Sequence, residues 1–329
     1  MRHSRPPQGN SSLAVPLPEA LKSPDAERVR RRNVLYGPWV PLGFVLPALV
    51  YFAAMFGYPL YYSISMSVRH FTVASFLTGV APFVGLRNYV DLFTDRLFLA
   101  ALGKTAIFTA FSIGGQMAVG MLLALFFRRA FPFSSAMRAL LLAPWLLPIV
   151  VSASVWRWMF AQDTGIINYV LLSAGVVSEP LPWLIEPAYA LCAVILTNIW
   201  IGIPFSMAVF HSGLQALPKE IFEAAEIDGA NAWQRFWFVT LPLLKPLTAI
   251  VFILSVTYTV KVFDLIFVMT GGGPAYGTET LAIRSYQLSF RDLDFGHGAA
   301  VGNVLILISL CFAFFYIRSF KRSLVVEEG

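Results

Sequence analysis

A short polar segment lies between two long apolar runs of this chain, and its residues suit electrostatic docking rather than bond-making chemistry. The segment reads Glu223-Ala224-Ala225-Glu226-Ile227-Asp228-Gly229-Ala230, and Leu241-Pro242 follows it. Pro218 suits the first turn of a helix, and the glycine permits the positive φ of a helix end. Such a helix is too short to be a domain. We therefore predict that a soluble partner binds it, although a solvated hairpin between two membrane helices would have the same pattern.

Several polar side chains lie inside the apolar runs themselves. They are Thr197, Asn198, Ser206, Ser255, Thr257, Tyr258, Thr259 and Asn303. Polar groups in lipid are costly, and they usually face the interior of a helix bundle or a water-filled cavity. These residues are therefore candidates for lining a substrate path. Hydrogen bonding between packed helices is the alternative use of the same groups, and the sequence leaves both open.

The composition indicates the elements that position these residues. Hydrophobic residues make up 57% of the chain and charged residues 13%, with a mean hydropathy of +0.69. Each apolar run is close to the ~20 residues with which a helix crosses ~30 Å of hydrocarbon. The runs cover residues 39–62, 105–127, 139–160, 188–210, 246–267 and 297–317. We predict an all-α polytopic membrane protein with six transmembrane helices, because barrel strands would alternate in polarity and be half as long.

The ends of the chain are polar. Residues 1–38 contain several prolines and no hydrophobic periodicity, and they are predicted to form a disordered tail. Residues 39–320 form the predicted transmembrane domain, and residues 321–329 a short C-terminal tail. Cys192 and Cys311 fall within different apolar runs, and we expect them to be unbridged packing residues.

Basic residues predict the orientation. With the N-terminus inside, sixteen Lys and Arg flank the helices on the cytoplasmic side and six on the opposite side. This asymmetry follows the positive-inside rule, so both termini and the Glu223 segment are predicted to be cytoplasmic. It also accounts for the net charge of +6, and no nucleic-acid partner is expected. The lipid bilayer is the expected surroundings.

Three connections deserve separate expectations. The outer connection 63–104 is predicted to contain an amphipathic helix around Asn88–Phe98, and 161–187 to form a structured cap. The connection 269–298 begins with Thr270-Gly271-Gly272-Gly273-Pro274, which ends a helix and turns the chain sharply.

A few ionisable residues lie near the ends of the runs. Lys261 and Asp264 are three residues apart, so on a helix they would share a face and pair; contact with a substrate or binding protein is the alternative. Arg157 is expected to extend its charge to the interface. His211 and His297 have no partner pattern, and we expect His211 to be structural.

The spacing around Glu223 resembles the EAA loop of inner-membrane permease subunits in binding-protein-dependent ABC importers. That pattern is Glu-Ala-Ala, three residues, Gly, nine residues, Ile, one residue and Leu-Pro. Glu223-Ala224-Ala225, Gly229 and Leu241-Pro242 match it at every spacing, with Val239 in place of Ile. Asp228 and Ala230, on either side of the glycine, resemble the carbohydrate branch of the family.

A second signature resembles one subtype. The Thr270–Pro274 turn with Thr278, and the small residues from Gly296 to Val304, are similar to the larger permease subunit of maltose-type importers. Counted from the EAA motif, Asn198, Gly202 and Ser255 fall where that subunit lines its sugar site. Amide, hydroxyl and aromatic groups suit sugar recognition. The resulting candidates for the substrate path are Asn198, Trp200, Gly202, Ser255, Tyr258 and Asn303.

The resemblance implies a transport subunit rather than an enzyme. Its partners would be a second, related permease, a dimer of cytoplasmic ABC ATPases and an extracytoplasmic sugar-binding protein. The Glu223 segment, about 218–242, would be a coupling helix seated in the ATPase. Its docking residues would be Glu223, Ala224, Ala225, Asp228, Gly229 and Ala230. ATP and Mg²⁺ would belong to the ATPase, because this chain has no phosphate-binding Gly-x-x-x-x-Gly-Lys-Ser/Thr loop. We expect no cofactor or metal here.

Other classes of function remain to be weighed against this one. An ion-coupled secondary carrier for a small polar solute would usually place a carboxylate deep in the membrane, and only Asp264 approaches that position. A membrane enzyme would need a ligand set or nucleophile. The acidic residues of the outer connections lack such spacing: Asp91, Asp95, Glu279, Asp292 and Asp294.

Overall fold

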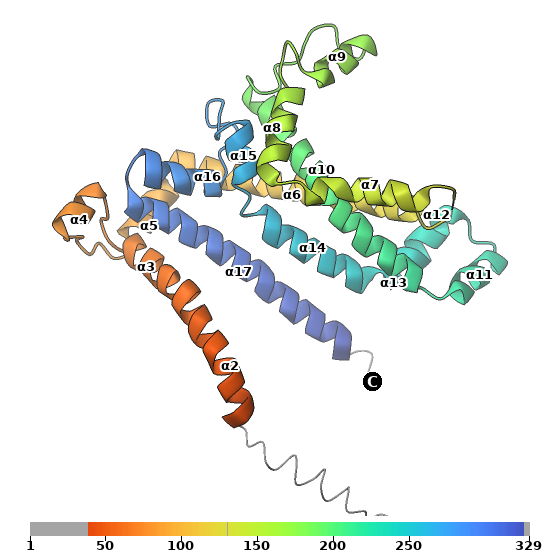
Figure 1. Cartoon of the computed structure of the whole chain (residues 1–329), viewed down its shortest axis with the longest axis horizontal. Coiled ribbons are helices and arrows are strands. Elements are labelled where there is room, and N and C mark those ends of the chain that lie inside the picture. The colour runs from red at the N-terminus through yellow and green to blue at the C-terminus, as the bar shows by residue number, and fades with distance from the viewer. Residues whose placement is uncertain (1–38, 130, 326–329) are drawn as a thin grey trace, which may run out of the picture. The chain divides into compact units, whose positions relative to one another are not determined.

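The computed structural model describes residues 39–129 and 131–325 (Figure 1). The predicted N-terminal tail, 1–38, lies outside the described residues, as do residues 326–329 of the predicted C-terminal tail, whereas 321–325 belong to the last helix. The described backbone is helical, and its only β pairings are two isolated bridges, Arg69 with Phe83 and Thr72 with Asp294. The prediction of an all-α protein is confirmed.

The chain divides into two compact units, with the boundary between Tyr61 and Tyr62. The described part of the first unit contains α2 (Trp39–Phe52), the π-helical turn η2 (Ala53–Gly57) and the start of α3 (Tyr58–Ser67). These elements form one uninterrupted run that includes the first predicted span.

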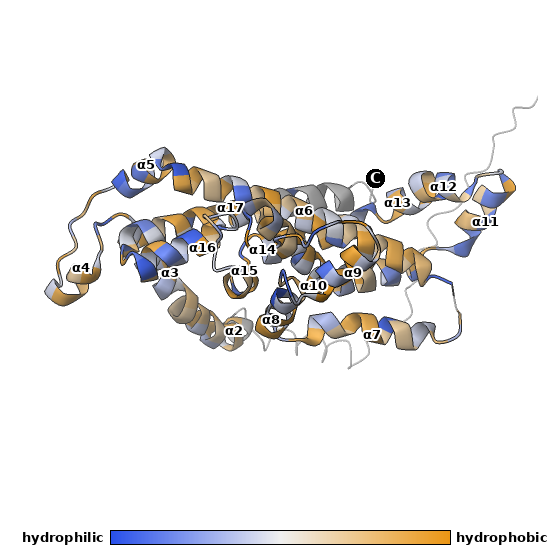
Figure 2. Ribbon diagram, turned by 90° about the horizontal axis from the view of Figure 1, so that it is seen from above, coloured by the Kyte–Doolittle hydropathy of each residue, from blue (hydrophilic) through white to orange (hydrophobic). Residues whose placement is uncertain are grey.

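The second unit contains the remaining elements, and α17 ends it. In chain order they are α4 (Val73–Thr78), α5 (Arg87–Thr94), α6 (Arg96–Phe126), α7 (Ser134–Leu146), α8 (Ile149–Met159), α9 (Ile166–Ser173), α10 (Pro187–Ala216), α11 (Lys219–Ile227), α12 (Ala232–Arg235), η3 (Phe236–Thr240), α13 (Leu241–Leu243), α14 (Lys245–Thr259), α15 (Asp264–Met269), α16 (Leu281–Tyr286), η4 (Gln287–Arg291) and α17 (Phe295–Val325). Figure 2 shows apolar residues dominating the middle of this unit and polar residues gathering in α5 and around α11.

Four helical segments in the described residues are long and apolar enough to cross a membrane alone: Leu42–Ser67, α6, α10 and Phe295–Phe314. Two further spans are bent pairs, with 99° between α7 and α8 and 71° between Ala232–Leu243 and α14. Counting each bent pair once gives six spans, one for each predicted run. Pro148 precedes α8, so the bend occurs where a proline disfavours helix in the residue before it.

The fifth predicted span, 246–267, was wrong at its outer end. α14 stops at Thr259, the backbone N–H of Val262 donates to Thr259 O over 3.1 Å, and α15 restarts at Asp264. The restart buries Leu265, Ile266 and Met269 in a cluster with Ala153 of α8. The packing of α15 against α8 therefore competes with a straight continuation of α14.

The most extensive helix contact among the described residues joins α6 and α10, and glycines lie along it. A Cβ built on Gly120 would lie 2.5 Å from Cβ of Ser206 and 3.0 Å from the backbone nitrogen of Met207. A Cβ on Gly115 would lie 2.4 Å from Cδ1 of Ile199. Small residues allow two membrane helices to approach this closely. Because lipid tails are as apolar as the side chains, the hydrophobic effect does not drive helices together in the membrane, and close packing stabilises the contact instead.

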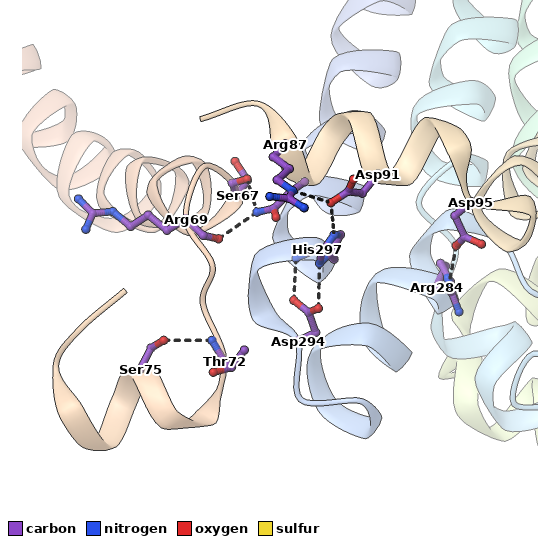
Figure 3. A network of polar contacts seen from close by, with 11 residues as sticks. Ser67, Arg69, Thr72, Ser75, Arg87, Asp91, Asp95, Arg284, Asp294 and His297 are labelled. Atoms are coloured by element: carbon purple, nitrogen blue, oxygen red, sulfur yellow. Dashed lines mark hydrogen bonds and ion pairs between the residues drawn. The ribbon is translucent and has the colours of Figure 1, made fainter. Parts of the chain in front are cut away.

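Charged groups fasten the end of the unit opposite α11 (Figure 3). Arg284 of α16 lies 3.0 Å from the carboxylate of Asp95 and 3.5 Å from that of Glu279, which is 1% exposed. Asp95 also accepts from the backbone N–H groups of Leu97 and Phe98, capping α6. Burial raises the pKa of Glu279, and the positive charges of Arg284 and Lys104 only partly oppose this effect.

A second polar group at this end fixes the start of α17. Asp294 accepts from the backbone N–H of His297 and from its ring, over 3.1 and 2.8 Å (Figure 3). The His297 ring also lies 3.8 Å from Asp91 of α5. Burial alone would raise the pKa of Asp294, but these hydrogen bonds hold it below its usual value. His297, for which the sequence offered no partner, thus joins α17 to α5.

Two expectations about the connections, and one about the cysteines, can now be compared with the structure. The helix expected around Asn88–Phe98 is instead broken at Asp95, which caps α6. The cap at 161–187 is structured as expected, because Asn168 donates to Gln162 O and Leu181 O and accepts from the Trp183 ring. Cys192 and Cys311 are unbridged, as expected, and both are exposed on the chain.

The α6–α10 contact yields a test of the fold. Gly120→Ala should destabilise the protein by about 1–3 kcal/mol, the usual cost of overpacking, because its Cβ meets backbone. Gly114→Ala is the matched control on the same helix, since nothing lies within 4 Å of its Cβ. Thermal unfolding in detergent, followed by fluorescence-detected size exclusion, should show a lower Tm for Gly120→Ala alone. Equal Tm values for the two variants would show that α6 and α10 move apart to admit the added methyl group without a cost in stability.

Candidate functional site

α11 ends in a hydrogen-bonded turn that the sequence anticipates. Gly229 has φ +79° and its N–H donates to Glu226 O over 3.1 Å, while Ala230 N–H donates to Ala225 O over 3.0 Å. These two bonds form a Schellman motif, which satisfies carbonyls at the helix end. No neighbouring atom lies within 4 Å of a Cβ built at Gly229. The glycine is therefore required by backbone conformation and not by space.

The next helix begins at once, so that α11 and α12 form a hairpin. Asn231 and Gln234 exchange side-chain and backbone hydrogen bonds of 2.9 Å, a capping box at the start of α12. Arg235 of α12 lies 3.1 Å from Glu226 of α11 and ties the two helices together. The element comprising α11, α12 and the turn between them is called the hairpin below.

One side of α11 faces the protein and the other is free. The guanidinium carbon of Arg128, just beyond α6, lies 4.0 Å from the ring centroid of Phe222. On the opposite side Glu223, Ala224 and Ile227 are exposed, Ile227 by 86%. Ala225 is half-buried. α11 thus exposes the acidic residues Glu220, Glu223 and Glu226 together with the apolar residues Ala224 and Ile227.

The six predicted docking residues lie together on the hairpin. Glu223, Ala224, Asp228 and Gly229 are exposed, and Ala225 and Ala230 are half-buried. The sequence missed the contribution of Phe222, Arg128 and Arg235 to holding this element in place. Phe222 directly precedes the motif and is the large apolar residue of α11's inner face, so helical periodicity is the signal that would have found it.

A cavity of about 540 Å³ lies where α6, α7, α10 and α14 meet. Four of the six predicted path residues line it: Asn198, Gly202, Ser255 and Tyr258. The others lie elsewhere. Trp200 has its ring against Trp156, with centroids 5.5 Å apart. Asn303 lies at the end where α5 and α17 meet, and it accepts from Ser63 over 3.0 Å.

The cavity contains an unused hydrogen-bond donor. Asn198 is 7% exposed, and its side-chain amide nitrogen has no hydrogen-bond partner. Its backbone oxygen accepts from the amide of Gln116 over 2.9 Å. A buried polar group without a partner costs about 1–3 kcal/mol. The Asn198 amide nitrogen is itself buried at the cavity wall, so it is a donor that a polar solute could use only after the lining side chains move.

Gln116 is a lining residue that the sequence reasoning missed. It is a polar residue within an apolar run, so the rule applied to Asn198 would have found it. A Cβ on Gly202 would lie 2.2 Å from its side-chain carbon, so Gly202 makes room for Gln116 beside the cavity. The aromatic residues Trp145 and Phe205 also line it, and they supply ring faces that sequence spacing did not suggest.

The break between α14 and α15 also faces the cavity. Thr259, Lys261 and Asp264 belong to its lining. Because the helix is interrupted, Lys261 and Asp264 do not share a helical face, and the expected ion pair between them is not formed. Instead the Lys261 ammonium lies 5.6 Å from the ring centroid of Tyr258. Interrupted backbone is tolerated at membrane depth where it lines a water-filled cavity or is buried in protein, and here the break has both surroundings: Lys261 and Asp264 line the cavity and Leu265 is buried against α8.

Two other ionisable residues make hydrogen bonds within the protein. Arg157 donates to the Val268 carbonyl over 3.3 Å, rather than only extending to the interface. His211 lies against Arg138 and Gln215, in agreement with a structural role. Among the described residues no group of three or more His, Cys, Asp or Glu is arranged to hold a metal ion.

With amide, hydroxyl and aromatic side chains in its lining, the cavity is suited to binding a hydroxylated solute.

Comparison with known proteins identifies the family of the chain. Residues 116–322 match the family model described as "Binding-protein-dependent transport system inner membrane component". The match begins at the lining residue Gln116 and includes the hairpin. The resemblance based on the Glu223 motif is confirmed.

Two relatives are similar over most of the chain. The sulfoquinovosyl glycerol transport system permease protein SmoG of Agrobacterium fabrum is 33% identical over 287 residues, 85% of this chain and 92% of the relative. The trehalose/maltose transport system permease protein MalF of Thermococcus litoralis is 34% identical over 237 residues, 72% and 79%. A chain of a bacterial ABC transporter that imports the acidic polysaccharide alginate has the same fold, with a TM-score of 0.71, 20% identity and coverage of 91% of this chain and 99% of its own.

Water access to the cavity can be tested by thiol labelling. In a background with Cys192 and Cys311 replaced by Ser, Tyr258→Cys should react with a membrane-impermeant methanethiosulfonate at least tenfold faster than Val256→Cys. Tyr258 lines the polar cavity, whereas Val256 is 2% exposed and lines an apolar pocket with α6 and α17. Similar slow rates at both positions in proteoliposomes would show that the cavity is dry.

Proposed function

Because the chain belongs to the family of inner-membrane components of binding-protein-dependent transport systems, we propose that it is the permease subunit of an importer for sugars or related polyols. The observation that carries the proposal is the cavity, whose lining includes Asn198, Ser255 and the aromatic residues Trp145, Phe205 and Tyr258. Sugars present many hydroxyl groups and apolar ring faces, which these groups complement. SmoG and MalF, named for a sulfosugar glycoside and for disaccharides, support this class.

The cavity would be half of the translocation path. A second, related permease would supply the other half, as the resemblance to the larger maltose-type subunit suggests. Asn198, Gly202, Ser255 and Tyr258 would contact substrate from this side. Trp200 and Asn303 have partners elsewhere and would act by positioning helices. The family assignment favours this function over an ion-coupled carrier, which would need no partner at the hairpin.

The hairpin would couple the permease to a cytoplasmic ATPase dimer. Ile227 and Ala224 would fill an apolar cleft, and Glu223 would meet a basic group of the ATPase. ATP and Mg²⁺ would act on that partner, so this chain would need no cofactor. An extracytoplasmic sugar-binding protein would approach the opposite end, near α5 and α16. Both termini would then be cytoplasmic, in agreement with the sixteen basic residues on that side.

Purification from native membranes in mild detergent tests the assembly. We expect the tagged chain to bring with it a second permease with the same motif, two copies of an ATPase and, when substrate is present, a binding protein. Substrate uptake by the assembly in proteoliposomes should require ATP inside. Transport by the chain alone would contradict the proposal.

Substitutions on the hairpin test the coupling role. Glu223→Lys and Gly229→Asp should each lower ATP-dependent uptake at least tenfold at unchanged membrane levels, by reversing a docking charge and by straining the turn. A non-glycine residue in the left-handed region costs roughly 1–2 kcal/mol.

Matched controls separate coupling from folding. Glu220→Lys changes the same charge one turn earlier on α11, and Gly175→Asp introduces the same strain at φ +67° in the outer cap, also with free space around it. Both should leave uptake within about twofold of wild type. Normal uptake by Glu223→Lys and Gly229→Asp would exclude the hairpin from coupling.

A further inference from the structure

We propose that Arg128 is the positioning residue that joins the hairpin to α6 and transmits hairpin movement to the cavity. The inference rests on the proposed coupling function and names the residues through which movement of the hairpin would reach the cavity. Arg128 lies outside the docking motif, and sequence spacing gives it no role beyond a basic residue at a helix end.

Arg128 is fixed to α6 and touches the hairpin from outside it. It follows Phe127, which is 3% exposed and whose N–H donates to Leu123 O over 2.9 Å at the end of α6. Its guanidinium covers the Phe222 ring at 4.0 Å. Among the ion pairs of the described residues Arg128 has no carboxylate partner, so an aromatic face is its partner here. Such cation–π contacts are usually made by arginine.

Arg235 has a different task, although it lies nearby. Its partner Glu226 belongs to the same hairpin, so that pair fixes the internal shape of the hairpin. Burial, and then the positive charge of Arg235, lower the pKa of Arg128, which agrees with the proximity of the two guanidinium groups. One arginine thus holds the hairpin together, and the other joins it to a membrane helix.

The hairpin keeps a second anchor if Arg128 is lost. Phe236, which directly follows α12, packs against a core cluster that includes Met121, Phe210 and Leu244. Removal of the Arg128 side chain should therefore leave the hairpin attached and able to dock. What is removed is the connection between α11 and the end of α6.

α6 continues from this connection to the cavity. It is an unbroken helix from Arg96 to Phe126, and Gln116 lies ten residues before its end, about 15 Å at 1.5 Å per residue. The Gln116 amide holds the backbone of Asn198, and the glycine contacts leave no space between α6 and α10. A displacement of the α6 end therefore reaches the Asn198 amide through rigid, contacting parts.

The test uses the purified complex in sealed proteoliposomes and needs no identified substrate. The probe is the labelling rate of Tyr258→Cys, measured with and without ATP and vanadate, in the background with Cys192 and Cys311 replaced by Ser. In the parent we expect nucleotide trapping to change the rate. Arg128→Ala should reduce that change at least fivefold while the ATPase still co-purifies in normal ratio.

Companion variants distinguish transmission from folding and docking. Phe222→Leu keeps apolar packing but removes the ring, and it should reproduce the loss. Arg128→Lys should restore part of the response, because an ammonium still binds the ring face. Arg129→Ala is the control on the neighbouring exposed arginine and should respond like the parent. Arg235→Ala should instead lower ATPase recovery.

Each other outcome overturns the inference. A normal nucleotide response in Arg128→Ala would show that α6 is moved by other contacts. Loss of the ATPase from Arg128→Ala, as from Arg235→Ala, would place Arg128 in the docking surface instead. Failure of the parent complex to recover any ATPase would contradict the proposed function itself, and it is recognised before any Arg128 variant is compared.

Discussion

The close contact between α6 and α10 is the constraint on which the rest of the second unit depends. Gly115 and Gly120 remove side chains from one side of the contact, and Gly202 makes space for Gln116 on the other. Without a hydrophobic effect between helices in lipid, this packing must fix their register by shape. That register places the Gln116 amide on the Asn198 backbone. The position of Asn198 at the cavity follows from this register. So does the rigid connection along α6 between the cavity and the hairpin.

Much of the hairpin and part of the cavity were predictable from local chemistry. Gly229 signals its turn because few other residues tolerate that backbone conformation, and Asn198 is conspicuous as an amide in an apolar run. The break at 260–263 was not predictable, because Lys261-Val262-Phe263 contains neither Gly nor Pro. Its cause is tertiary: α15 buries its apolar side chains against α8. The partners of Arg128 and Gln116 also depend on segments distant in sequence.

The two ends of the second unit differ in how they are held. The end near α16 is fixed by buried charges, with Arg284 shared between Glu279 and Asp95. Burying such charges is costly unless each is paired, so this end resists separation into its parts. At the hairpin end, α11 is held by an exposed ion pair and a cation–π contact, each worth about 1 kcal/mol or less, and apolar packing begins only at Phe236, after α12. A unit anchored firmly at one end and weakly at the other is suited to movement at the weak end.

The bend after α7 affects how the wall of the cavity is built. α7 has 13 residues, or roughly 20 Å of helix, whereas the hydrocarbon layer is about 30 Å thick. α8 turns away by 99°, so this pair does not cross such a layer as one straight helix. Pro144 and Trp145 of α7 line the cavity. Because these lining residues belong to a short straight segment and not to a full-length span, a rotation of α7 would change the cavity wall directly.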